Sequence, residues 1–151
     1  MKDVFTFITF LSLFSFGIDF FSVISFERGS KLVPSSARII TFKSVLGWAI
    51  FSVAPVKSLT TVLPLIAVLF VILFQIEISI LWWIGLFVQF VYGVYYIGYI
   101  YPKMRRFANW DLKNPTAKWE ELYLSFAKAN SILLIFGSVT SVLLCIAFFL
   151  S

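Results

Sequence analysis

The sequence contains no histidine and only one cysteine, Cys145. The lack of histidine excludes Ser-His-Asp catalysis, histidine-based proton transfer, histidine-ligated haem and the common zinc sites. A single cysteine excludes an intramolecular disulfide bond. We therefore expect no metal, no cofactor and no catalytic residue, and we interpret the protein as a non-enzyme.

Charged residues are also scarce: they make up 13% of the 151 residues, whereas 61% are hydrophobic and 19 are Phe. A soluble domain has about 25% charged and about 45–50% apolar residues. The apolar residues form long runs with few charges, a pattern typical of an integral membrane protein. In a soluble protein the net charge of +5 would suggest nucleic acid as a partner. Here the basic residues lie mainly between the apolar runs. We therefore expect the lipid bilayer as the partner and no nucleic acid, and no soluble small-molecule substrate can be identified.

The apolar runs predict an all-α integral membrane protein, a bundle of four transmembrane helices in a single domain, residues 1–151. About 20 apolar residues are needed to cross a bilayer as a helix. Residues 58–101 are too many for one crossing, and they are interrupted only by Gln75 and Glu77. That interruption predicts a tight turn. The expected spans are residues 4–26, 58–75, 78–101 and 123–150.

Between the first two spans, residues 38–54 are apolar, but too few of them run clear of charge for a complete crossing. This favours an additional interfacial or re-entrant amphipathic helix. The alternative is a full, kinked span that passes through Pro55. After the third span, residues 102–122 form a predicted cytoplasmic loop, in which Asn114-Pro115 is a typical helix start.

The basic residues predict how the chain is oriented. Eleven of the twelve Lys and Arg lie in the segments after spans one and three, including the start of span four, and only Lys2 lies elsewhere. Basic loops face the cytoplasm. We therefore expect a protein of the cytoplasmic (plasma) membrane with both termini outside and the basic loops inside.

Span one contains an acid, Asp19, within an apolar run. Ser12, Ser15 and Ser22 share its helical face, because the four residues are three or four positions apart. An acid facing lipid costs at least about 2.5–3.5 kcal/mol. This face should therefore contact protein, and we expect helix packing through these serines.

Spans three and four have comparable faces of small and polar residues, which allow close helix packing. The expected packing residues there are Gly85, Gly93, Gly137, Ser141 and Cys145. With these faces together, the bundle would enclose a polar cluster of Asp19, Gln89, Lys128 and Asn130. Depth along the helices suggests Lys128 or Asn130 as the partner that compensates Asp19.

Two further groups have the pattern of interface residues. Aromatic side chains at the ends of a span favour the boundary between lipid and water. Basic residues next to a span favour lipid headgroups. These residues are Trp82, Trp83, Arg105 and Arg106.

The absence of catalytic equipment and the polar helix faces favour a non-catalytic accessory subunit of a larger membrane complex, such as a respiratory or transport assembly, with other integral membrane subunits as partners. The alternative is a small oligomeric transporter, channel or ligand-binding protein that uses Asp19, since intramembrane acids are functional candidates. A lone acid without a second titratable group at mid-depth is a poor proton relay, so the sequence favours the structural role.

Overall fold

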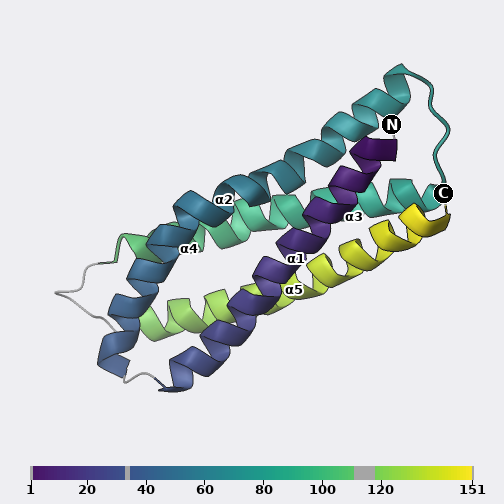
Figure 1. Ribbon diagram of the computed structural model, residues 1–151. Helices are drawn as coiled ribbons and strands as arrows, with labels where there is room; N and C mark the ends of the chain where they lie inside the picture. Colours follow the sequence, from purple (N-terminus) through teal and green to yellow (C-terminus); the bar gives the residue numbers. More distant parts are fainter. Residues whose placement is uncertain (1, 33–34, 111–117, 151) are drawn as a thin grey trace.

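The computed structural model describes residues 2–32, 35–110 and 118–150, and these residues contain helices and no strands (Figure 1). The predicted helix start at Asn114-Pro115 lies outside the described residues. The helices are α1 (Lys2–Leu32), α2 (Ser35–Leu73), α3 (Ile80–Tyr95), the π-helical turn η1 (Tyr96–Ile100), α4 (Tyr101–Ala108) and α5 (Lys118–Leu150).

Four helical segments are long and apolar enough to cross a membrane, which confirms the predicted number of spans and indicates a multi-pass helical membrane protein. Every segment begins at a different residue from the predicted run, and the last three segments are also longer than predicted. Their bounds are Asp3–Ile24, Ala37–Leu73, Ile80–Ala108 and Trp119–Leu150.

The largest correction concerns α2. The separate amphipathic helix expected at residues 38–54 and the span expected at residues 58–75 form one helix of 39 residues, with Pro55 and Pro64 inside it. Proline removes a backbone donor, and neighbouring helices in a membrane bundle can satisfy the carbonyl that is left free. Pro64 frees the carbonyl of Thr60, and the side-chain Nε2 of Gln89 donates to that carbonyl at 3.1 Å. A side chain of α3 therefore satisfies the carbonyl that Pro64 leaves free.

The connection between α2 and α3 contains the predicted turn at residues 75–77. Gln75 has a positive φ of 50°, a left-handed conformation that reverses the chain after Leu73. The segment that follows stays helical for longer than expected, because residues 102–108 of the predicted loop belong to α4. In η1 the N–H of Tyr101 donates to the carbonyl of Tyr96, five residues back, immediately before Pro102.

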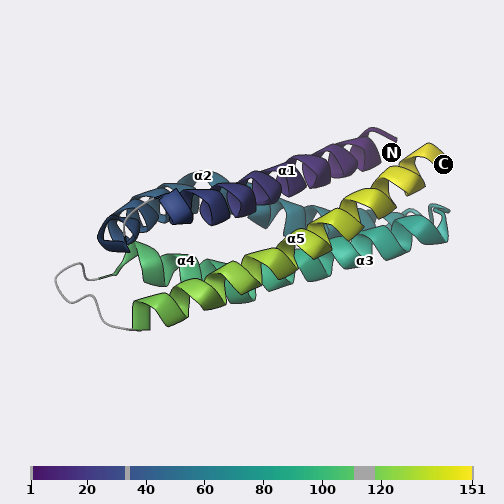
Figure 2. The same cartoon turned by 90° about the horizontal axis from the view of Figure 1, so that it is seen from below.

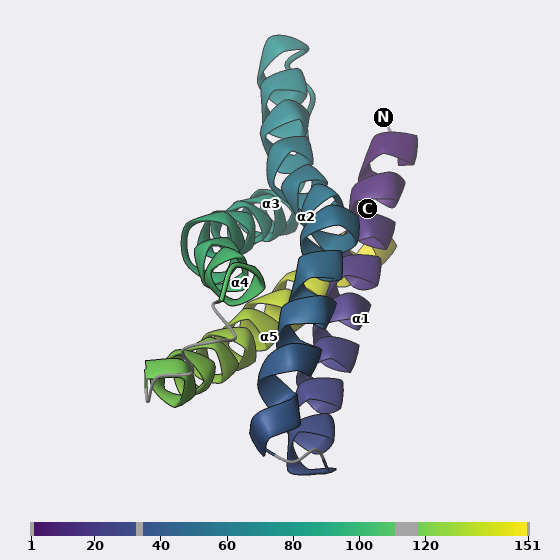
Figure 3. The same cartoon turned by 90° about the vertical axis from the view of Figure 1, so that its left-hand side faces the viewer.

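Successive long helices run in opposite directions, and the two termini lie at the same end as the connection between α2 and α3 (Figures 1 and 2). Both α1 and α3 pack on α2 and on α5, while α4 packs on α2. The view along the bundle shows α2 crossing between α1 and α3 (Figure 3). The fold is therefore an up-down-up-down four-helix bundle, which brings residues from all four segments together at one level.

The interior has apolar side chains at both ends and polar side chains between them. At the end with the termini, the terminal cluster consists of Phe5, Ile8, Ala67, Val71, Trp82, Leu86, Leu144 and Ala147. At the opposite end, the basic-end cluster includes Phe42, Leu46, Ile100, Met104, Phe107, Trp119, Phe126, Ala129 and Leu133. Between them lies the polar layer, which we define as Ser12, Ser15, Asp19, Lys57, Thr60, Thr61, Gln89, Tyr92 and Ser141.

Candidate functional site: a buried ion pair

An ion pair between Asp19 of α1 and Lys57 of α2 lies at the centre of the polar layer. The Nζ of Lys57 is 2.7 Å from Oδ1 of Asp19, and the Lys57 side chain is completely buried. From Trp82 to Tyr92, which touches this pair, α3 rises about 15 Å. That is half of a hydrocarbon core of roughly 30 Å. In a membrane the pair would therefore lie near mid-depth, where an unpaired charge is most costly.

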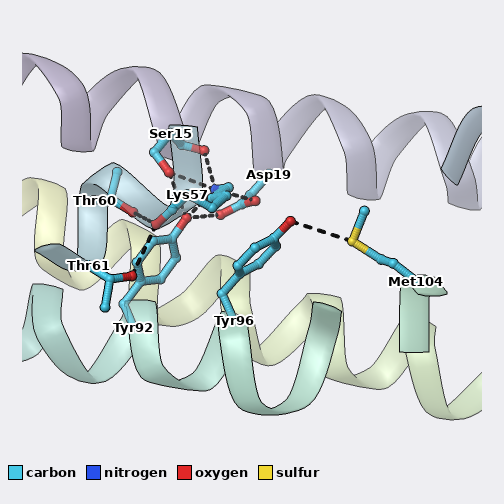
Figure 4. Close-up of polar contacts among 8 residues, drawn as sticks. All are labelled: Ser15, Asp19, Lys57, Thr60, Thr61, Tyr92, Tyr96 and Met104. Atoms are coloured by element: carbon cyan, nitrogen blue, oxygen red, sulfur yellow. Dashed lines mark hydrogen bonds and ion pairs between the residues drawn. The ribbon is translucent and has the colours of Figure 1, made fainter. Parts of the chain in front are cut away.

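Tyr92 of α3 closes the ion pair from a third helix. Its hydroxyl donates to Oδ2 of Asp19 at 2.5 Å and also accepts a hydrogen bond from Nζ of Lys57. The ammonium group lies 4.9 Å from the centroid of the Tyr92 ring, within range of a cation–π interaction. Each oxygen of the carboxylate thus has its own partner, and each partner comes from a different helix (Figure 4).

Ser15 lies one helical turn before Asp19 and is fully buried. Lys57 Nζ donates to the Ser15 carbonyl at 2.9 Å and to its hydroxyl at 2.7 Å. The Ser15 hydroxyl is also 2.9 Å from the Tyr92 hydroxyl. The ammonium therefore has more acceptors within reach than it has protons, so it can shift between acceptors without leaving the site.

Gln89 extends the polar layer towards the terminal cluster. Ser12 donates to the side-chain carbonyl of Gln89 at 2.9 Å, while the Gln89 amide donates to the Thr60 carbonyl described above. The hydroxyls of Ser12 and Ser141 are 3.4 Å apart. This set joins all four membrane-crossing segments through side chains that are each at most 7% exposed.

Glycines set how closely the helices approach the polar layer. A Cβ added to Gly93 would lie 2.1 Å from Oγ1 of Thr61, so α2 and α3 can meet there only without a side chain. A Cβ on Gly137 of α5 would lie 3.7 Å from Oδ2 of Asp19 and 3.4 Å from the Tyr92 ring. The predicted packing glycines thus lie at helix contacts, and Gly137 faces the carboxylate itself.

The prediction that Lys128 or Asn130 compensates Asp19 is wrong. Lys128 is exposed on α5, and Asp19 pairs with Lys57 instead. The reason is depth: Gly137 is the α5 residue level with Asp19, and Asn130 lies about 10 Å farther along the helix.

The other predicted site residues occupy different positions in the bundle. Gly85 contacts the Leu144 side chain, and Ser141 is buried beside Ser12. Ser22 and Cys145 are half-buried, and the cysteine is a free thiol. Trp82 is 3% exposed and packs on Phe5 with ring centroids 4.4 Å apart, and its place at the membrane interface stays a prediction. Trp83 is half-buried beside the terminal cluster, and Arg105 and Arg106 are exposed on α4.

Lys57 is the residue of this candidate site that the sequence analysis does not identify, because that analysis groups it with the basic segment after the first span. One signal was available. Lys57 is the only charged residue between Lys43 and Glu77, so a helix that continued through Pro55 would carry a single cation far from either end. Intramembrane cations pair with intramembrane acids. Once the helix is continuous, Asp19 is the natural counter-charge.

Across residues 2–32, 35–110 and 118–150, no group of three or more His, Cys, Asp or Glu side chains is arranged to hold a metal ion. Comparisons with protein family models, with curated proteins and with solved structures found no match. The acid, the ammonium and the phenol of the polar layer are therefore the features from which a function can be proposed.

Proposed function

We propose that this protein is a small membrane transport protein whose Asp19–Lys57 ion pair takes part in moving a proton together with an ion. One observation carries this proposal: an acid, a base and a phenol from three helices meet in one buried hydrogen-bonded cluster. The sequence favoured a structural role because Asp19 had no titratable partner at its depth. Lys57 and Tyr92 are such partners.

Burying the charges of Asp19 and Lys57 has a free-energy cost. Taking an acid and a base out of water costs several kcal/mol for each ion, and replacing a buried pair by apolar residues is often neutral or stabilising. Packing alone therefore does not require Asp19 and Lys57. Ionisable residues inside membrane proteins often mark proton and ion pathways. A change in protonation at Asp19 would release Lys57 and alter the contacts between α1, α2 and α3.

The helix that carries Tyr92 also has an irregularity suited to movement. The π-helical turn η1 begins four residues after Tyr92, and π-turns inside α-helices occur frequently at functional sites. Within η1, Gly98 has no atom within 4 Å of an added Cβ, so that side of the turn is open. A shift of this turn would rotate α3 relative to its neighbours. We expect the transport unit to be an oligomer, with both termini outside and the basic end in the cytoplasm.

The test is proton movement in vesicles that contain the purified protein, a pH-sensitive dye in the lumen and mixed sodium, potassium, chloride and nitrate salts. We expect wild-type protein to dissipate an imposed pH gradient faster than protein with Asp19→Asn, because the amide cannot carry a proton in place of the carboxylate. The control is Gly17→Ala in the same helix, where an added Cβ meets nothing within 4 Å. Equal rates for wild type and folded Asp19→Asn would refute the proposal.

An accessory subunit of a larger membrane complex is the second candidate. It is favoured by the closure of the polar layer, since Asp19 and Lys57 are at most 6% exposed and every hydrogen bond described above is internal. The polar faces are then used within the chain, so any contact with other subunits would involve the outer apolar faces. Mild-detergent purification distinguishes the candidates: stoichiometric recovery with a larger complex favours the subunit, and a homo-oligomer favours the transporter.

A further inference from the structure

We infer that the ion that moves with the proton is a small oxyanion, which binds Lys57 in place of the Asp19 carboxylate when Asp19 is protonated. This inference rests on the proposed transport function and goes beyond it by naming the chemical class of the substrate. Three features of the site support it: the donor geometry around Asp19, the charge of the ion pair and the groups that surround it.

The donors around Asp19 form an arrangement that suits two oxygens of one anion. Lys57 Nζ contacts Oδ1 at 2.7 Å, and the Tyr92 hydroxyl contacts Oδ2 at 2.5 Å. The Ser15 hydroxyl lies 2.7 Å from the same Nζ and can turn its proton towards a new acceptor. Charge-assisted donors of this kind bind carboxylates and similar oxyanions strongly. A small oxyanion with two free oxygens would offer these donors the same kind of acceptors as the Asp19 carboxylate does.

The charge of the site distinguishes an anion from a cation. The pair is neutral as long as Asp19 is ionised and Lys57 is protonated. When Asp19 takes a proton from water, its bond to Lys57 weakens and a buried ammonium loses its counter-charge, which is costly at this depth. A monovalent anion on Lys57 restores neutrality. A metal cation would instead have to displace Lys57 from Asp19 and lie beside it, so two positive charges would share one buried site.

Among the described residues, the groups that face the pair include no other counter-charge. From α1 come Asp19 and Ser15, from α2 Lys57, and from α3 Tyr92 with Tyr96, whose ring centroid is 5.9 Å from the ammonium. The part of α5 at this level is Gly137. Within the described residues, the ion pair of Lys57 is with Asp19 alone. A proton on Asp19 and an anion on Lys57 would then enter and leave together, with no net charge moved.

Nitrate is a suitable probe, because it is planar, presents its oxygens as a carboxylate does and stays charged at all working pH values. Vesicles with wild-type protein and a pH dye would receive an inward nitrate gradient, with gluconate, a much larger anion, as the replacement. We expect the lumen to acidify with nitrate and not with gluconate, without added valinomycin, and to the same extent with sodium or choline as the cation.

The variants separate the roles of the two charges. Asp19→Asn should lose nitrate-driven proton entry down to the level of protein-free vesicles. It should retain nitrate uptake, which now carries charge and is accelerated by potassium with valinomycin. Lys57→Met should lose both, whereas Lys57→Arg keeps the positive charge and should retain nitrate-dependent acidification. Each variant is compared with Gly17→Ala at equal amounts of monodisperse protein.

The possible failures are distinguishable. If acidification follows the sodium or potassium gradient and ignores nitrate, the anion inference is wrong while the proposed transport function stands. Retention of nitrate-driven acidification by Lys57→Met also overturns the inference. If wild-type protein moves no protons in the mixed salts, the proposed function fails first, and the anion inference fails with it.

Discussion

The terminal cluster and the polar layer lie next to each other in the same four-helix bundle, yet they hold the helices together by different means. In the terminal cluster, Leu144 and Ala147 are completely buried against apolar neighbours from the other helices. In the polar layer, Lys57 is equally buried, but its contacts are an ion pair and hydrogen bonds. Burial is the same in both regions and the chemistry differs.

The difference matters because lipid is as apolar as leucine. Transferring Leu144 from lipid to the interior gives no hydrophobic gain, so the terminal cluster is stabilised by close packing. An acid or a base differs from leucine, because exposing it to lipid costs free energy. The polar layer therefore determines which faces of α1, α2 and α3 point inwards. The terminal cluster then stabilises that arrangement through close packing of complementary side chains. Changes in the two regions should differ in size accordingly.

The largest effect is expected in the polar layer, for Lys57→Met. Removing one partner of a buried pair leaves Asp19 without its counter-charge, which typically costs about 3–5 kcal/mol. Unfolding in mixed detergent micelles with increasing sodium dodecyl sulfate would measure the free energy. The double variant Asp19→Asn with Lys57→Met leaves no buried charge and should be more stable than Lys57→Met alone. A double variant as unstable as the single one would argue against the pair.

The terminal cluster should show the next largest effect, for Leu144→Ala. The residue is 0% exposed, and its deletion leaves a cavity against Gly85. We expect a loss of about 2–3 kcal/mol, at the lower end for buried leucines because lipid supplies no hydrophobic term. The control is Val142→Ala on the same helix, where the side chain is 57% exposed and its loss should have little effect. Equal losses for the two variants would contradict the packing of α5 on α3.

A smaller effect is expected where the polar layer depends on close approach, for Gly93→Ala. The added Cβ would lie 2.1 Å from Oγ1 and 2.7 Å from Cβ of Thr61, so α2 and α3 would have to separate. Overpacking of this kind costs about 1–3 kcal/mol. Gly17→Ala meets nothing within 4 Å and should be neutral or stabilising by up to about 1 kcal/mol. The same unfolding assay applies, and a harmless Gly93→Ala would mean that the two helices are farther apart.

The smallest effect is expected for Ser12→Ala, at the edge of the polar layer. The change removes the hydrogen bond from the Ser12 hydroxyl to Gln89 while the Gln89 amide keeps the Thr60 carbonyl. Side-chain hydrogen bonds between membrane helices average about 0.6 kcal/mol. A loss as large as that of Lys57→Met would show that neutral hydrogen bonds matter as much as the ion pair, and would remove the contrast between them.

The comparison also explains what the sequence could predict. Long apolar runs predict the four segments, because hydropathy and length are local properties, and helical spacing predicts that Ser12, Ser15 and Asp19 share a face. The partner of Asp19 depends on which residues of other helices lie at the same depth, which depends in turn on whether α2 continues through its prolines. A helix break at Pro55 would leave Lys57 between two helices, whereas the continuous α2 carries Lys57 into the interior beside Asp19. The carbonyl freed by Pro64 is satisfied by Gln89, a contact that no local pattern contains.

Exchanging the two charges shows whether Asp19 and Lys57 are needed as a pair of opposite charges. Asp19→Lys alone places two bases in the site, and Lys57→Asp alone places two acids there. We expect both single variants to unfold at a lower temperature than wild type, and the double variant Asp19→Lys with Lys57→Asp to unfold at a higher temperature than either. A double variant no more stable than the weaker single variant would contradict the pairing.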